Sequence, residues 1–181
     1  DADVPAERGL PRGHAKGGAV SPRLHGAGRY HLAARPLDHV VQRPWVQGRE
    51  AKPDGFWYGL GSGWLHFRQE GGAPMRVGRG TFVHALQLDL SRILRLTTVA
   101  QIRAFTAKYR DDTNTYPGTM WIDWRKVERD FAGIEIAPYQ YRLRFDRNVS
   151  WYYPWDVASG CLWDVDVIKH VEYRGRVGAA R

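Results

Sequence analysis

Cysteine is almost absent from this sequence of 181 residues, in which Cys161 is the single one. One cysteine excludes an internal disulfide and leaves too few thiolates for the usual structural zinc sites. No run of eighteen apolar residues occurs either, so a membrane-spanning helix is not expected. The first residues lack the apolar centre of a secretory signal peptide. These absences predict a protein of the cytosol, or one that is delivered into a cytosol.

Several common catalytic motifs are missing as well. The sequence contains no GxxxxGK[ST] loop, no GxGxxG after a predicted strand, no HExxH and no paired cysteines. These patterns hold phosphates, dinucleotides or zinc in well-known enzyme classes. Their absence argues against a P-loop ATPase, a Rossmann dehydrogenase, a zinc hydrolase and a zinc finger.

Aromatic and basic residues, in contrast, are abundant. The sequence is 13% aromatic, with eight tryptophans and nine tyrosines, and its formal net charge is +8. Residues 51–110 carry nine Lys and Arg against three acids, whereas residues 111–140 carry three against six. A positive balance favours acidic partners. Two interpretations stay open: a basic face for nucleic acid or for a cofactor's phosphates, or an arginine-rich composition that keeps the protein in solution.

The chain divides into a short leader and one domain. Residues 1–28 are rich in Gly, Pro, Ala and Arg and have almost no large apolar side chains. Such a segment buries too little surface to offset its chain entropy, which predicts a disordered leader or linker. Residues 29–181 are predicted to form a single α+β domain. Within it, four glycines at 71–80 predict a flexible loop.

The order of predicted elements indicates the fold class. Thr98 and Gln101 form a capping box, which predicts a helix over 98–110. A second helix is predicted over 121–131, with Asp123 in its first turn. Because the strands do not alternate with these helices, we expect a mostly antiparallel, split or strongly twisted sheet with two helices. The predicted strands span 30–34, 55–60, 81–90, 133–138, 141–145, 150–155, 160–163 and 168–173.

Aromatic rings and small polar residues gather in three stretches, which we interpret as the walls of one cleft. Alternation along the first strand points His31 away from Tyr30 and Leu32. Its imidazole then faces either solvent or a cleft, where it could bind a sugar hydroxyl or act as an acid or base. The three stretches comprise residues 29–37, 52–64 and 151–165.

The second stretch offers a platform for a flat ligand. Alternation places Trp57 and Tyr58 on opposite faces of one strand, so one enters the core and the other is free to stack. Trp64, just after the following turn, is a candidate for the opposite wall. The alternative is that all of these rings are core residues.

Polar residues on the later strands have two interpretations each. Glu135 lies between Ile134 and Ile136 on a strand, so its carboxylate faces either solvent or the cleft. Asp156 either caps the turn after the aromatic run or belongs to the site. Ser159 needs a neighbouring base to act as a nucleophile, and the sequence around it supplies none.

A histidine on the first strand, a Gly-x-aromatic-aromatic strand and a polar residue on a late strand together resemble the His–Tyr–Glu type of ADP-ribosyltransferase. That group includes poly-ADP-ribose polymerases, diphtheria-like toxins and RNA 2′-phosphotransferases. The resemblance implies an ADP-ribosyltransferase-like fold that binds NAD. It also implies that His31 binds a ribose of NAD and that Tyr58 or Trp64 stacks on nicotinamide.

The third position of this pattern stays open among Glu135, Asp156 and Ser159, because the sequence has no Glu-x-Glu or Gln-x-Glu pair. In the family, a glutamate there holds the nicotinamide ribose and stabilises a cationic transition state. Basic side chains would meet the pyrophosphate and neighbouring rings would line the site. The residues predicted to bind NAD are Arg29, His31, Lys52, Trp57, Tyr58 and Trp64, with Arg35 as a further cation near the pyrophosphate.

The chain is also similar to small proteins of actinobacterial phages and their hosts that share the patterns KPxGxW, GIEIxPY and WDxxSGCxW. The resulting hypothesis is an ADP-ribosyltransferase or NAD-binding relative. It would cleave the nicotinamide–ribose bond and transfer ADP-ribose to a macromolecule, with RNA or DNA as candidate acceptors. Two alternatives remain: a non-catalytic nucleic-acid-binding protein, or a phage or host structural protein whose aromatic residues are all core and interface.

Overall fold

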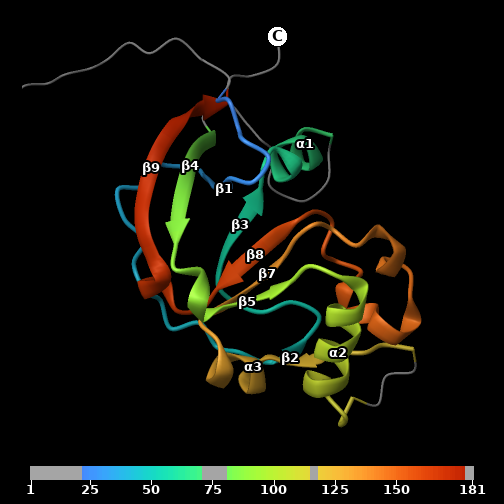
Figure 1. Ribbon diagram of the computed structural model, residues 1–181. Coiled ribbons are helices and arrows are strands. Elements are labelled where there is room, and N and C mark those ends of the chain that lie inside the picture. The colour runs from blue at the N-terminus through green and yellow to red at the C-terminus, as the bar shows by residue number, and fades with distance from the viewer. Residues whose placement is uncertain (1–21, 71–80, 115–117, 178–181) are drawn as a thin grey trace, which may run out of the picture.

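The computed structural model describes residues 22–70, 81–114 and 118–177 (Figure 1). Most of the predicted leader, and the loop predicted at 71–80, lie outside these residues. The strands are β1 (Arg29–Ala33), β2 (Arg49–Glu50), β3 (Phe56–Leu60), β4 (Thr81–Leu88), β5 (Ile93–Leu96), β6 (Ile122–Asp123), β7 (Gly133–Ile136), β8 (Ser159–Leu162) and β9 (Ile168–Val177). The α-helices are α1 (Gly63–Gln69), α2 (Val99–Tyr109) and α3 (Trp124–Asp130), and the 3-10 turns are η1 (Leu90–Arg92), η2 (Tyr141–Leu143), η3 (Arg147–Tyr152) and η4 (Val165–Val167).

Seven strands form the main sheet, in the order β5-β7-β8-β3-β1-β4-β9, and β2 pairs with β6 in a small second sheet. Strands β5 and β7 run parallel, and the other paired neighbours run antiparallel. The predicted α+β class with a mostly antiparallel sheet is therefore confirmed. In the described part of the chain, none of the helices has the length and apolar character needed to span a bilayer.

The main sheet is strongly curved (Figure 1). Four strands separate β4 from β5 in the sheet order, which in a flat sheet would place them about 24 Å apart. The chain from Leu88 to Ile93 spans at most about 17 Å, and part of it is the compact turn η1. The sheet must therefore curl, and its inner face encloses a cluster that contains Tyr58, Leu86 and Leu162.

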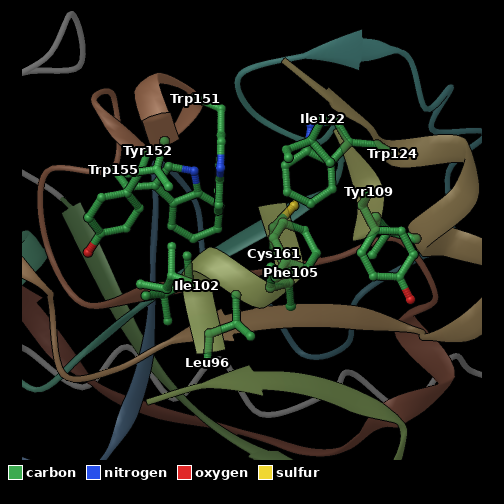
Figure 2. Packing of buried hydrophobic residues seen from close by; sticks show 14 of the residues in the cluster. Leu96, Ile102, Phe105, Tyr109, Ile122, Trp124, Trp151, Tyr152, Trp155 and Cys161 are labelled. Atoms are coloured by element: carbon green, nitrogen blue, oxygen red, sulfur yellow. The ribbon is translucent and has the colours of Figure 1, made fainter. Parts of the chain in front are cut away.

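The largest core lies between the outer face of the sheet, α2 and the segment around η3 (Figure 2). Trp124, Trp151 and Trp155 are fully buried there. Trp151 meets both of the others edge to face, with ring centroids 6.0 and 6.1 Å apart. Its indole N–H donates to the Thr106 hydroxyl at 2.8 Å, which satisfies the one polar group of this buried ring.

Helix α2 begins as the sequence predicts. The Thr98 hydroxyl accepts a hydrogen bond from the Gln101 amide, and the Gln101 side chain accepts one from the Thr98 amide, so the capping box is confirmed. Helix α3 is shorter than predicted and begins at Trp124. Asp123 precedes it but makes no capping bond, because its carboxylate accepts hydrogen bonds from Arg125 instead.

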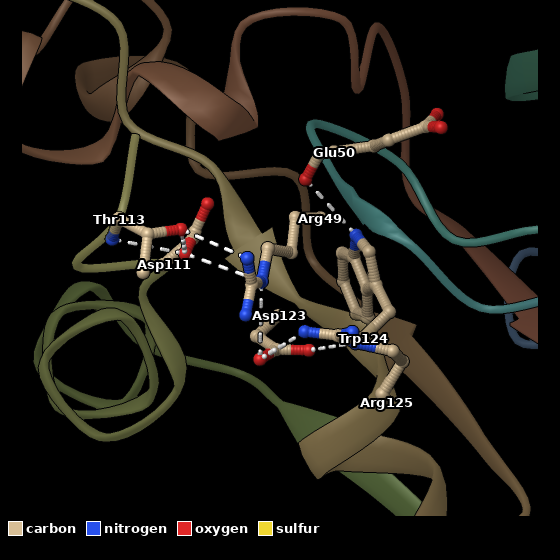
Figure 3. Close-up of polar contacts among 7 residues, drawn as sticks. All are labelled: Arg49, Glu50, Asp111, Thr113, Asp123, Trp124 and Arg125. Carbon is tan, nitrogen blue, oxygen red and sulfur yellow. Dashed lines mark hydrogen bonds and ion pairs between the residues drawn. The ribbon is translucent and has the colours of Figure 1, made fainter. Parts of the chain in front are cut away.

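Arginine and aspartate tie the small β2–β6 sheet to the start of α3 (Figure 3). The Arg49 guanidinium lies 3.4 Å from the Asp111 carboxylate and 3.7 Å from that of Asp123. Arg125 adds two hydrogen bonds to Asp123, at 2.9 and 3.0 Å, and these hold the pKa of Asp123 below its usual value. We interpret this network as a structural clamp. No group of His, Cys, Asp and Glu within the described ranges is arranged to hold a metal ion.

Two predicted strands, 141–145 and 150–155, are wrong: neither range contains a strand, and each begins in a 3-10 turn. The Asp146 side chain accepts a hydrogen bond from the Asn148 amide and starts η3, so a local bond replaces a strand ladder. Trp151 and Tyr152 are adjacent and both fully buried, which the alternation of a one-sided strand does not permit. The sequence reasoning also missed helix α1, which begins where a turn was expected.

Candidate functional site

One row of residues crosses the inner face of the curled sheet. Cross-strand pairing aligns Arg95 with Glu135, Glu135 with Gly160 and Gly160 with Tyr58. On the other side of β3, strand β1 pairs Tyr30 with Gly59, and His31 is the next residue along β1. His31 pairs with His84, which pairs with Tyr173. We call these seven residues the polar row. It contains three of the predicted catalytic residues, contributed by β1, β3 and β7.

Glu135 is the centre of the row and is only 1% exposed. Arg29 donates two hydrogen bonds to its carboxylate, from Nε to Oε2 at 2.5 Å and from Nη2 to Oε1 at 2.9 Å. Arg95 donates to Oε1 at 3.2 Å, and the Tyr58 hydroxyl donates to Oε2 at 3.0 Å. Each carboxylate oxygen therefore accepts two hydrogen bonds, which is the full capacity of the group. We call these four residues the Glu135 cluster.

Two cations surround one anion in the Glu135 cluster, so it carries a surplus positive charge. Burial alone would lower the pKa of Arg29, but its hydrogen bonds and charge interaction with Glu135 raise it. Burial raises the pKa of Tyr58 well above its usual value, and Glu135 raises it further, so the phenol stays protonated and donates. The Arg95 side chain is 48% exposed, which brings the surplus charge to the surface.

Gly160 makes the contact between Tyr58 and Glu135 possible. The Tyr58 ring crosses β8 directly over this glycine, and a Cβ added there would overlap the ring and approach the backbone of Ile134. Any larger residue would therefore push the hydroxyl away from the carboxylate. The consequence of this arrangement is that the Tyr58 ring is fully buried and offers no face to a ligand.

His31 is held beside the cluster as a neutral imidazole. Its Nδ1 lies 2.7 Å from the Trp57 carbonyl, and because a carbonyl only accepts, Nδ1 carries the proton and Nε2 is an acceptor. Its ring stacks on Phe56 at 4.1 Å. Burial lowers the pKa of His31 to about 4, although the hydrogen bond to Trp57 opposes the shift. His84, opposite His31 in the row, accepts from the Leu37 amide at 3.0 Å.

Three other predicted site residues gather on the outer face of the sheet. Trp57 points away from Tyr58, as alternation predicts, and packs on Trp155 with ring centroids 5.0 Å apart. The Lys52 ammonium lies 5.1 Å from the centre of the Trp57 ring. Burial lowers the pKa of Lys52, and the nearby carboxylate of Asp156 opposes this shift. This face is separate from the polar row.

Trp64, Ser159 and Cys161 have packing roles. Trp64 lies on α1 and covers Gly59, where an added Cβ would come 2.7 Å from the Trp64 Cβ. Ser159 is buried on β8, and its hydroxyl donates to the Val157 carbonyl at 3.0 Å. Cys161 is fully buried, which raises the pKa of its thiol well above the usual value. Arg35 is exposed between β1 and β2.

The structure thus brings His31, Tyr58 and Glu135 together with Arg29 and divides them by the sheet from the other candidates. Sequence reasoning missed Arg95 and Gly160. Arg95 could have been found, because it is the single charge in the apolar strand ILRL, just as Glu135 is in GIEI. The need for Gly160 depends on the pairing of β3 with β8, which the sequence does not specify.

Comparisons with known proteins add no further evidence. No family model, curated protein or solved structure matches this chain. The function of this chain must therefore be inferred from the geometry of the polar row and the chemistry of its residues.

Proposed function

We propose that this protein is an NAD-binding relative of the ADP-ribosyltransferases, which cleaves the nicotinamide–ribose bond and transfers ADP-ribose to a macromolecule. The observation that supports this most is the Glu135 cluster. Side chains with strongly shifted pKa values are concentrated at functional sites, and Tyr58 in this cluster and His31 on the adjacent strand are of this kind. The histidine, tyrosine and glutamate of the proposed family pattern occur here in one row across the sheet.

The residues of the inner face fit the polar parts of NAD. Arg29 and Arg95 provide guanidinium groups whose planar forks match phosphate oxygens, and their surplus charge favours an anionic ligand. The Nε2 lone pair of His31 can accept a hydrogen bond from a ribose hydroxyl. NAD supplies a glycosidic bond whose cleavage develops positive charge on ribose, and Glu135 is the carboxylate that would stabilise this charge.

Two features of the described arrangement modify the roles that the family pattern assigns. Because the ring of Tyr58 is buried, the stacking role passes to Phe56, which is partly exposed and already contacts His31. Because Glu135 accepts four hydrogen bonds, its charge is fully compensated. Arg95 is the more exposed of the two arginines that bind Glu135. It can therefore leave the carboxylate and bind a phosphate at a lower cost in free energy than Arg29. Its departure would remove the surplus positive charge and leave the carboxylate paired with Arg29.

An assay with labelled NAD tests this function. Purified protein is incubated with NAD carrying a label on the adenylate, together with RNA, DNA or cell lysate, and nicotinamide release is measured in parallel. We expect nicotinamide release and label on one of the acceptors. If no nicotinamide is released and no acceptor is labelled, the enzymatic proposal is contradicted.

Two substitutions connect the activity to the site. Arg95→Gln removes one cation from the half-exposed side of the cluster and should lower turnover at subsaturating NAD. His170→Ala changes an exposed histidine on β9 and is the matched control for His31→Ala. We expect His31→Ala to reduce activity while His170→Ala does not. A folded His31→Ala protein with unchanged activity would remove His31 from the site.

A further inference from the structure

A second surface of the molecule combines aromatic rings with arginine, at the segment between β7 and β8. In the part of the chain that the structure describes, six large hydrophobic residues are strongly exposed, and three of them lie in this segment. Tyr141, Phe145 and Tyr153 are 68, 72 and 53% exposed. Figure 1 shows the segment, in orange, beyond α2 and on the opposite side of the molecule from β9. With Arg142, Arg144 and Arg147 we call it the aromatic–arginine surface.

The exposed rings belong to a segment whose other half is firmly anchored. Trp151, Tyr152 and Trp155 from the same segment are fully buried in the main core, where Figure 2 shows them packed beside Ile102. The Tyr152 hydroxyl accepts a hydrogen bond from the Gln140 amide at 2.8 Å. The exposed rings are therefore presented by a fixed scaffold, so little ordering entropy is lost when they bind a partner.

Arg144 organises the exposed part of this surface. Its guanidinium lies 5.9 Å from the centre of the Phe145 ring and 5.7 Å from that of Tyr153. The two rings are themselves 5.9 Å apart. A hydrogen bond of 3.2 Å to Asp156 holds Arg144 in this position. Two rings, inclined at 52° to each other, and a guanidinium group thus lie together at one place on the surface.

The charge of the surface is positive. Asp146 is paired with Arg103 and Asp156 with Arg144, so both acids of the segment are neutralised. Arg142 and Arg147 are exposed, and within the described residues neither has an ion-pair partner. These two guanidinium groups are available to an anionic partner on the same segment as the rings.

We propose that the aromatic–arginine surface binds single-stranded nucleic acid. A partner for it must offer flat rings and regularly spaced negative charges, and nucleic acid offers both. The bases of a duplex are stacked on one another and present only their edges, whereas an unpaired strand exposes base faces to Phe145 and Tyr153. The phosphates of the same strand would meet Arg142 and Arg147. This inference does not depend on NAD binding at the polar row.

Fluorescence anisotropy with labelled 12-nucleotide oligo(U) and oligo(dT), in the absence of NAD, tests the proposal. We expect binding that weakens as salt is raised. The double variant F145A/Y153A should raise Kd by about tenfold or more, because each stacked base contributes strongly to affinity. V46A truncates another strongly exposed apolar side chain, on the loop between β1 and β2 and outside both surfaces, and should leave Kd unchanged. Thermal melting of each variant confirms that it is folded.

The arginines are tested through the salt dependence. R142Q/R147Q should lower the slope of log K against log salt by about 0.7 for each phosphate that the protein no longer neutralises, whereas R43Q, an exposed arginine outside the surface, should not. Three results would overturn the proposal: no binding by the wild type, equal loss of affinity in V46A and F145A/Y153A, or tighter binding to a duplex or to vesicles with anionic lipid. Because NAD is omitted, these results leave the proposed transferase activity to be judged by its own assay.

Discussion

The Glu135 cluster and the aromatic–arginine surface use the same side-chain types in opposite ways. In the cluster, Arg29, Arg95 and Tyr58 converge on a carboxylate that is 1% exposed, and every hydrogen-bonding position of that carboxylate is filled. On the surface, Phe145 is 72% exposed and two arginines have no acidic partner among the described residues. Burial therefore decides the role of each side chain: Arg29 and Tyr58 stabilise the fold, whereas the half-exposed Arg95 and the side chains of the aromatic–arginine surface remain available to a partner.

This contrast leads to opposite expectations for substitutions. Changes in the cluster should lower stability strongly, because they leave buried groups without partners. Changes on the surface should leave stability almost unchanged and alter binding instead. The predictions below, from the largest effect on stability to the smallest, test whether the two regions really differ in this way.

The largest loss is expected for Glu135→Ala. Arg29 and the Tyr58 hydroxyl would lose their acceptor inside the sheet, and breaking such a buried pair costs about 3–5 kcal/mol. Urea denaturation measures this loss. Glu172→Ala, an exposed glutamate on β9, is the control and should change the free energy of unfolding by less than about 0.5 kcal/mol. Equal effects of the two substitutions would contradict the role assigned to the cluster.

Acid should weaken the protein through His31. Its folded-state pKa of about 4 lies below its ordinary value of 6.5, so the unfolded chain takes up the proton first as the pH falls. The contribution of His31 to the free energy of unfolding is therefore complete above pH 6.5. It is lost between pH 6.5 and about 4, and the total loss is about 3 kcal/mol. His84, whose pKa burial also lowers, contributes in the same direction.

His31→Gln isolates the share of His31 in this pH dependence. Denaturation midpoints at pH 7 and pH 4.5 should differ less in the variant than in the wild type. An identical difference in both proteins would show that the imidazole of His31 is not held neutral by burial.

Gly160→Ala tests whether the ring of Tyr58 must cross β8. The new methyl group would overlap that ring, and such overpacking costs about 1–3 kcal/mol. A pH titration followed by tyrosine absorbance is a second measurement. A displaced Tyr58 hydroxyl would lose its hydrogen bond to Glu135 and would ionise at a lower pH. A variant as stable as the wild type would show that the ring does not need this glycine.

Phe145→Ala should have the smallest effect on stability, below about 0.5 kcal/mol, because the ring is largely exposed. The same variant should bind nucleic acid more weakly, because one stacking ring is removed. A large loss of stability would mean that the exposed rings are part of the core, and the contrast between the two regions would fail.

Local signals in the sequence predicted much of the fold. The capping box of Thr98 and Gln101 depends on two residues three positions apart, and it is confirmed. The strand predicted around Glu135 is confirmed, but its carboxylate, predicted to face solvent or a cleft, is buried among hydrogen-bond donors. The aromatic run at 150–155 was misread, because its rings are buried by packing on α2 and not by pairing with a strand. Aromatic content favours a strand, but tertiary contacts decided otherwise.

The alternation of side chains along a β-strand allowed the direction of several site residues to be predicted from the sequence. Trp57 and Tyr58 do point to opposite faces of β3. Which of the two would be exposed could not be read from the strand itself, because both faces of the sheet are covered. The separation of Asp156 and Ser159 from His31 depends on how β8 pairs with β3 and β7, and this long-range register has no local signature.

Calorimetric titration of the protein with NAD is the most direct test of the central claim, that the polar row binds this dinucleotide. We predict saturable binding to the wild type, weaker binding to Arg95→Gln and unchanged binding to Arg43→Gln, whose arginine is exposed and pairs with no residue of the cluster. Absence of binding by the folded wild-type protein, or equal affinity of the wild type and Arg95→Gln, would contradict the account.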